Sequence, residues 1–76
     1  MKDLLNYIVK NIIPESDFEI EEVDEEGRIN LILKVNKDNM GLIIGKGGNT
    51  VRSIRNLLKV KATLTNSLFN LQVEEK

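Results

Sequence analysis

Residues 43 to 51 read Ile43-Ile44-Gly45-Lys46-Gly47-Gly48-Asn49-Thr50-Val51. Within this stretch, positions 45 to 48 hold three glycines and one lysine. Glycine lets the backbone turn through positive φ and lets a ligand approach bare amides. The first amides of a following helix also point outward without helical partners, which favours anions there. The stretch therefore predicts an anion-binding turn between two helices.

Two common phosphate-binding motifs do not fit this turn. A Walker loop needs four residues between its first glycine and Gly-Lys, whereas Gly41 and Gly45-Lys46 are separated by three. A dinucleotide-binding loop that starts at Gly45 needs glycine at position 50, where the chain has Thr50. The spacing excludes both motifs.

Helical periodicity surrounds the glycine-rich turn. The spacing of aliphatic residues predicts a helix over residues 2–12, which we expect Pro14 to end. The same spacing predicts a long helix over residues 49–65. Before the turn, Asp38 is expected to cap a short helical segment over residues 39–44, because its carboxylate can accept from unpaired amides.

Alternating hydrophobicity predicts three strands. The clearest covers residues 29–35, and another covers residues 68–74. A strand over residues 18–23 breaks the alternation, which indicates a bulged or edge strand, and residues 24–27 are expected to form the turn that follows it. The resulting order, α-β-β-α-α-β, predicts an α+β fold with helices packed on one face of a three-stranded sheet.

The composition indicates one folded domain over residues 1–76, with 41% hydrophobic and 30% charged residues. The chain has no cysteine and no histidine, which excludes a disulfide framework, a zinc site and a Ser-His-Asp triad. We expect no catalytic residue, no metal, no cofactor and no small-molecule substrate. Its longest aliphatic runs have three residues, so we expect no membrane span and a cytoplasmic protein.

Charge is segregated along the sequence. The net charge is −1, which by itself argues against a nucleic-acid partner. From Glu15 to Glu26, however, there are eight acidic residues and no base, whereas Lys34 to Lys61 holds seven bases and one acid. The second segment therefore has a local charge of +6 and contains the glycine-rich turn.

The motif and the order of elements resemble those of a known family. Two aliphatic residues, Gly-x-x-Gly and an aliphatic residue three positions later resemble the signature of KH domains. The order α-β-β-α-α-β resembles the type II form of bacteria, and the whole chain is similar to small stand-alone bacterial KH proteins of the KhpA type. In KH domains the Gly-x-x-Gly loop clamps the backbone of about four single-stranded nucleotides.

The resemblance implies RNA contacts in and beside the loop. The spacing also places Arg52, Arg55 and Lys59 in one basic stripe on the long helix. One of Ile43 and Ile44 is expected to form the floor of a groove for bases, since both cannot point into the core; which one does so stays open. The expected RNA-binding residues are Ile43, Ile44, Gly45, Lys46, Gly47, Gly48, Asn49, Arg52 and Arg55.

The predicted function is weak binding of single-stranded RNA without catalysis. The resemblance implies a post-transcriptional regulator or RNA chaperone that forms a homodimer, or a heterodimer with a larger KH-containing protein. The alternative is a module for protein-protein interaction or dimerisation with little intrinsic RNA binding.

Overall fold

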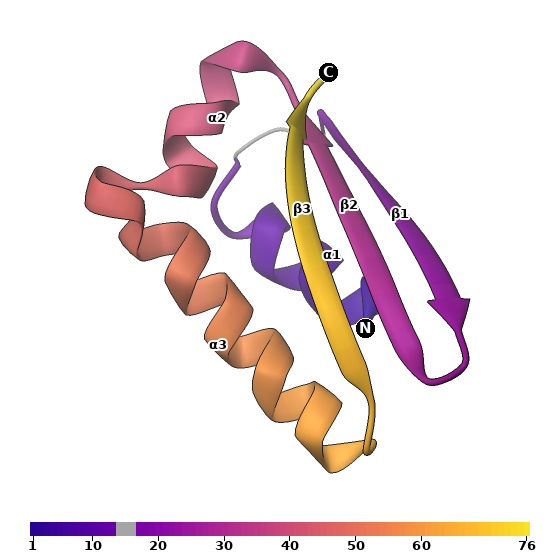
Figure 1. Ribbon diagram of the computed structural model, residues 1–76. Helices are drawn as coiled ribbons and strands as arrows, with labels where there is room; N and C mark the ends of the chain where they lie inside the picture. Colours follow the sequence, from indigo (N-terminus) through magenta and orange to yellow (C-terminus); the bar gives the residue numbers. More distant parts are fainter. Residues whose placement is uncertain (14–16) are drawn as a thin grey trace.

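The computed structural model describes residues 1–13 and 17–76 (Figure 1). Pro14, the expected end of the first helix, lies outside these residues. The elements follow the predicted order, with a short 3₁₀ turn added between the last two helices. They are α1 (Lys2–Lys10), β1 (Phe18–Glu25), β2 (Arg28–Val35), α2 (Lys37–Ile44), η1 (Lys46–Gly48), α3 (Asn49–Leu64) and β3 (Leu68–Glu75).

The three strands form one mixed sheet in the order β1-β2-β3. β1 and β2 are antiparallel neighbours joined by a tight turn, whereas β2 and β3 are parallel. Parallel neighbours need a long crossover, and here the crossover consists of α2, the glycine-rich loop and α3. The candidate site therefore lies in the connection between the two parallel strands.

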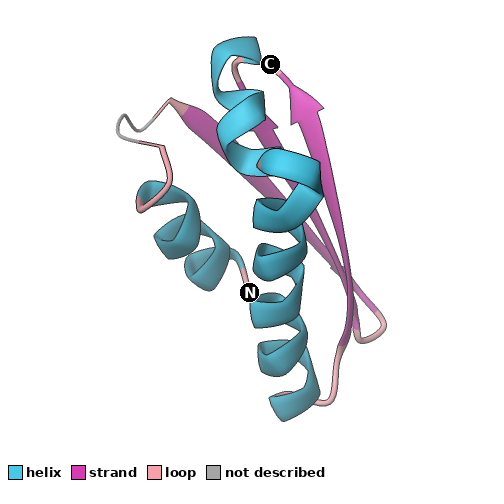
Figure 2. Cartoon of the chain, turned by 90° about the vertical axis from the view of Figure 1, so that its left-hand side faces the viewer, coloured by secondary structure: helices cyan, strands magenta, loops and turns pink. Residues whose placement is uncertain are grey.

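All the helices pack on one face of the sheet (Figure 2), as the sequence predicts. The alternating residues Ile29, Leu31, Leu33 and Val35 of β2 are buried against them. α3 buries Val51, Ile54, Leu58 and Ala62. The core is one continuous cluster of aliphatic side chains, and the α+β prediction with the type II KH order is confirmed.

The β1–β2 hairpin differs in detail from the prediction. β1 continues to Glu25, and the turn consists only of Glu26 and Gly27 instead of residues 24–27. Both turn residues have positive φ, +50° and +81°, as in the two-residue turn that matches the twist of a hairpin. Pairing with β2 is unbroken from Phe18 to Glu25, so the expected bulge is absent from the described strand, while its edge position is confirmed.

Two helix boundaries also differ. α1 ends at Lys10 instead of residue 12, and the Asn11 side chain donates a hydrogen bond to the Tyr7 carbonyl at 2.8 Å. Such side-chain bonds compete with continued helix. α2 starts at Lys37 with Asn36 as its N-cap, whose carbonyl accepts from the amides of Asn39 and Met40. Asp38 therefore lies inside the first turn and is not the cap.

Candidate nucleic-acid interface

The loop between α2 and α3 is a single tight turn built on glycine. Gly45, Gly47 and Gly48 have φ of +74°, +65° and +78°. The Gly48 amide donates to the Gly45 carbonyl at 3.1 Å, and the Asn49 amide donates to the Lys46 carbonyl. Within the described residues, the amides of Lys46 and Gly47 donate to no backbone carbonyl. These two amides, at the start of the turn, are therefore available to an anion.

Gly45 is the position where the fold requires glycine most strictly. A Cβ built there lies 2.2 Å from Thr50 Oγ1 and 2.8 Å from the Thr50 amide nitrogen. The second contact is with backbone, so a different side chain at position 50 does not remove it. At Gly47 a Cβ meets nothing within 4 Å. Packing of Gly45 on Thr50 therefore fixes how the loop enters α3, and Gly47 leaves the tip of the loop open.

The basic side chains near the loop have different partners. Lys46 is exposed at the tip of the loop, and Arg52 reaches the Asn49 side-chain oxygen at 3.5 Å. Arg55 instead donates to the Leu71 carbonyl on β3 at 3.4 Å. Arg55 thus links α3 to the sheet, while Lys46 and Arg52 remain next to the loop with their charges exposed. Lys59 continues the basic side of α3 and is exposed.

The bond to Leu71 identifies a free sheet edge beside α3. The amides of Leu68 and Lys76 point toward β2, where they donate to Gly27 and Val35. Because alternate residues of a strand direct their backbone groups to opposite sides, Phe69, Leu71 and Val73 direct theirs away from β2. The loop, the basic side of α3 and this strand edge therefore border the same surface.

The two isoleucines before the loop differ in their exposure to solvent. Ile43 is fully buried in the core, so the expected direct RNA contact is withdrawn for Ile43 because it has no surface to offer. Ile44 is partly exposed directly before Gly45. Ile44 is thus the one of the pair that can line a groove.

The acidic segment before β2 lies at the sheet edge away from the basic side of α3. β1, which carries Glu19, Glu21 and Glu22 among its acids, is the sheet edge farthest from α3 (Figure 1). Lys34, counted with the basic segment in the sequence, is on β2 and donates to Glu21 at 3.0 Å. That hydrogen bond, with the nearby negative charge, raises the pKa of Lys34 above its usual 10.5. Lys34 therefore belongs to the acidic side of the protein, and the positive charge near the loop comes from α3 and Lys46.

Other kinds of site find no support in the part of the chain that the structure describes. No group of three acidic residues there is arranged to hold a metal ion. None of its helices is both long and apolar enough to cross a membrane.

Comparison with known proteins identifies the family. A family model described as "KhpA/KhpB, KH domain" matches residues 2–74. The chain belongs to this family. KhpA/KhpB relatives include the protein of Chlamydia caviae named RNA-binding protein KhpA, which is 42% identical over 77 residues, covering 99% of this chain and 97% of that protein. The protein of the same name from Clostridium perfringens is 37% identical over 74 residues, covering 96% and 99%.

Within this KhpA/KhpB fold, two contributors to the site leave no direct sign in the sequence. The Leu71 carbonyl cannot be found from side-chain patterns, because backbone groups are the same at every residue. Thr50 stands in the quoted motif, yet only the close approach of its backbone explains why position 45 is glycine. By contrast, glycine density and helical spacing predict the loop itself and the adjacent arginines as candidate site residues.

Proposed function

We propose that this protein binds single-stranded RNA without catalysis, with the loop between α2 and α3 as the phosphate-binding element. The observation that carries the proposal is the loop geometry. The amides of Lys46 and Gly47 have no carbonyl partner, the Lys46 side chain is exposed beside them, and a 16-residue helix starts directly after the loop. Helix N-termini favour negative charge by roughly 0.3–1 kcal/mol. The relatives named RNA-binding protein KhpA support the same ligand.

The remaining predicted residues have separate parts in this proposal. Phosphates bind the amides of Lys46 and Gly47 and the side chains of Lys46 and Arg52. Bases lie in the space between α3 and the edge of β3, with Ile44 as an apolar contact. Gly45, Gly48 and Asn49 shape the loop, because the amides of the latter two are already bonded within it. Arg55 borders the base-binding side through its bond to Leu71.

The biological role that we propose is post-transcriptional regulation or RNA chaperoning in the cytoplasm, by one domain that covers residues 1–76. The site offers hydrogen-bond donors and positive charge, which bind a phosphate backbone without needing a particular base. We also propose that the domain associates with a second KH domain, in a homodimer or with a larger KH-containing protein. The family description, which groups KhpA with KhpB, supports such a pairing.

The test reverses the charge of the loop and compares the effect on RNA binding with that of an equal charge change elsewhere. Lys46→Asp with Gly47→Asp changes the net charge by −3 at the loop tip. Lys2→Asp with Asn70→Asp makes the same change at exposed positions of α1 and β3. Binding of a short unstructured RNA is measured across salt concentrations, after circular dichroism has shown that each variant is folded.

For the unmodified chain we expect a log-log salt slope of about −2 to −3, which corresponds to roughly three or four phosphate contacts on a single strand. The loop variant should lose most of this binding, whereas the control variant should keep the slope and lose little affinity. If the folded loop variant binds as well as the control, the loop is not the phosphate site.

A further inference from the structure

The outer edge of β3 offers backbone hydrogen-bonding groups to a ligand. β3 is an edge strand, and Phe69, Leu71 and Val73 direct their N–H and C=O groups away from β2. Each of these residues therefore brings one donor and one acceptor to the space beside α3. A base placed against such a residue meets a donor next to an acceptor.

Leu71 differs from the other outward-facing residues of β3 because its carbonyl is already bonded. Arg55 Nη2 donates to it at 3.4 Å, and this is the one hydrogen bond of the Arg55 side chain among the described residues. A guanidinium carries five N–H donors and no acceptor. The Leu71 carbonyl keeps a second lone pair, but a donor that approaches it also meets the positive guanidinium. Position 71 thus presents donors to a ligand: its own amide and the remaining N–H groups of Arg55.

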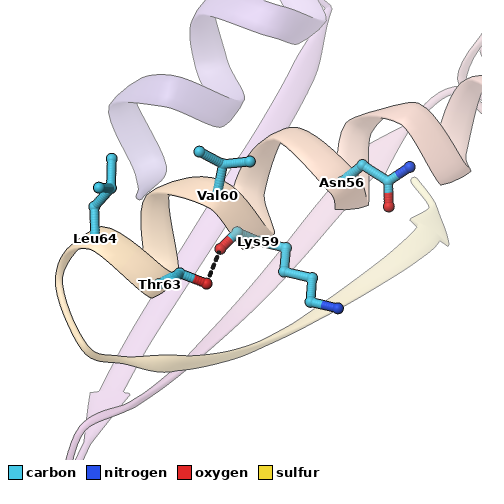
Figure 3. A pocket seen from close by; sticks show the side chains of 5 residues that line it. All are labelled: Asn56, Lys59, Val60, Thr63 and Leu64. Carbon is cyan, nitrogen blue, oxygen red and sulfur yellow. Dashed lines mark hydrogen bonds between the residues drawn. The ribbon is translucent and has the colours of Figure 1, made fainter.

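Arg55 belongs to the basic side of α3. Residues four apart on a helix lie on the same side, which places Lys59 one turn after Arg55. Figure 3 shows Lys59 pointing away from Val60 and Leu64, so the basic side and these apolar side chains occupy different parts of the helix surface. The Arg55 bond joins the basic side to the edge of β3, and its guanidinium therefore lies in the space that the proposed function assigns to bases.

Two neighbouring donors distinguish between the four bases. Guanine presents two adjacent acceptors, O6 and N7, and cytosine presents O2 and N3. In adenine each acceptor of these edges adjoins the N6 amino donor, and in uracil O2 and O4 are separated by the N3–H donor. Guanine and cytosine can therefore accept from both donors at position 71, whereas adenine and uracil place a donor against one of them.

We propose that Arg55 determines base specificity: by covering the Leu71 carbonyl, it makes this position favour a base with two adjacent acceptors, guanine or cytosine, over adenine and uracil. The inference rests on the proposed RNA binding and specifies the bases that the site takes. Phosphate contacts carry no sequence information, so the preference concerns the one nucleotide beside Leu71. Without Arg55, the Leu71 N–H and C=O form a donor–acceptor pair, which fits adenine N1 and N6.

The experiment measures affinity by fluorescence anisotropy for unstructured RNAs of about seven nucleotides, chosen against the roughly four that one loop holds. The RNAs differ only in the central base, which is guanine, cytosine, adenine or uracil, and every other base is uracil. The specificity variant is Arg55→Ala. The matched control is Arg52→Ala, which removes the same side chain from a phosphate-binding position of the same helix. Circular dichroism confirms the fold of both variants.

For the unmodified chain we expect the RNA with central guanine or cytosine to bind at least about fivefold more tightly than those with adenine or uracil. Arg55→Ala should abolish this ratio, so that adenine binds as well as the favoured base. Arg52→Ala should weaken binding of every RNA by a similar factor and keep the ratio, because it removes a phosphate contact.

A second measurement needs no variant. RNA with 7-deazaguanine or 3-deazacytosine at the centre lacks one of the two adjacent acceptors, and the unmodified chain should bind it no more tightly than the adenine RNA. The inference is overturned by equal affinity for all central bases, by a preference for adenine or uracil, by full affinity for the deaza RNA, by a ratio that persists in folded Arg55→Ala, or by its equal loss in Arg52→Ala. Absence of any RNA binding by the unmodified chain refutes instead the proposed function.

Discussion

Gly45 shows how a single residue can fix the site. Its φ of 74° and ψ of 171° lie in a region that is essentially restricted to glycine, whereas Gly47, with φ of 65° and ψ of 18°, is in the left-handed region, which costs an L-residue about 1–2 kcal/mol. Only at Gly45 does a side chain also collide with the backbone of Thr50, at 2.8 Å from its nitrogen. The two glycines therefore differ both in backbone conformation and in the space around them.

We predict that Gly45→Ala lowers the free energy of unfolding by about 2–5 kcal/mol, because the backbone strain is joined by overpacking of roughly 1–3 kcal/mol. Gly47→Ala should lower it by only about 1–2 kcal/mol. Urea unfolding of the two variants measures the difference. Equal losses would show that α3 shifts at little cost to accommodate the methyl group.

The two isoleucines mark the limit of sequence reasoning at this scale. Their spacing shows that only one of them can enter the core, but both carry the same side chain in a helix of two turns. The start of α2 decides which one is buried. Since α2 begins at Lys37 instead of residue 39, the orientation of its last turn could not be derived from the short predicted segment.

At the scale of elements, the hairpin turn contains a residue whose type disagrees with its backbone. Glu26 has φ of +50°, and two-residue hairpin turns with positive φ at both positions strongly favour Asn-Gly. This tight turn is hard to predict because Glu26-Gly27 lacks that signature and the acidic run continues through it. The strand therefore seemed two residues shorter than it is.

We predict that Glu26→Asn raises the free energy of unfolding by about 0.5–1 kcal/mol, since asparagine adopts positive φ more readily than glutamate. Glu25→Asn is the matched control, because it removes the same charge from an adjacent strand position without positive φ. Thermal unfolding distinguishes the two. A similar gain in both variants would assign the effect to relief of acidic repulsion.

The link between α3 and β3 gives a second prediction at this scale. Arg55→Ala removes the bond to the Leu71 carbonyl and should lower the free energy of unfolding by about 0.5–1.5 kcal/mol. Arg52→Ala removes only a contact between two exposed side chains of the same helix, those of Arg52 and Asn49, and should change it by less than about 0.5 kcal/mol. Urea unfolding tests both variants. An equal loss would mean that the Arg55 bond contributes nothing.

At the scale of the whole molecule, the fold follows from the sequence more completely than the site does. Helical and alternating periodicities reflect burial, which also dominates the energy of a small domain, so element order and layers were predictable. The site depends on backbone atoms, on the exact start of α2 and on pairs such as Lys34 with Glu21, none of which leaves a periodic pattern. The charge separation was visible along the chain, yet the side on which Lys34 lies was not.

The small core makes stability sensitive to single buried positions. A protein of this length is expected to have about 4–11 kcal/mol of stability. Leu58 is fully buried and its neighbour Leu57 is 52% exposed. We predict that Leu58→Ala costs about 2–5 kcal/mol and lowers the melting temperature by roughly 10–30 °C. Leu57→Ala, measured without RNA in the same calorimeter, should cost less than about 0.5 kcal/mol; comparable losses would contradict the assigned burial.

The parallel pairing of β2 with β3 also has a kinetic consequence. Each paired β3 residue lies 40 positions after its β2 partner, whereas the β1–β2 hairpin closes over a two-residue turn. Hairpins form in about 1–10 µs, and pairings between distant residues form more slowly. We therefore expect the acidic hairpin to form early during folding. Arg55 of α3 finds the Leu71 carbonyl only when the C-terminal strand has been added, so a partly folded chain presents negative charge before the surface between α3 and β3 is complete.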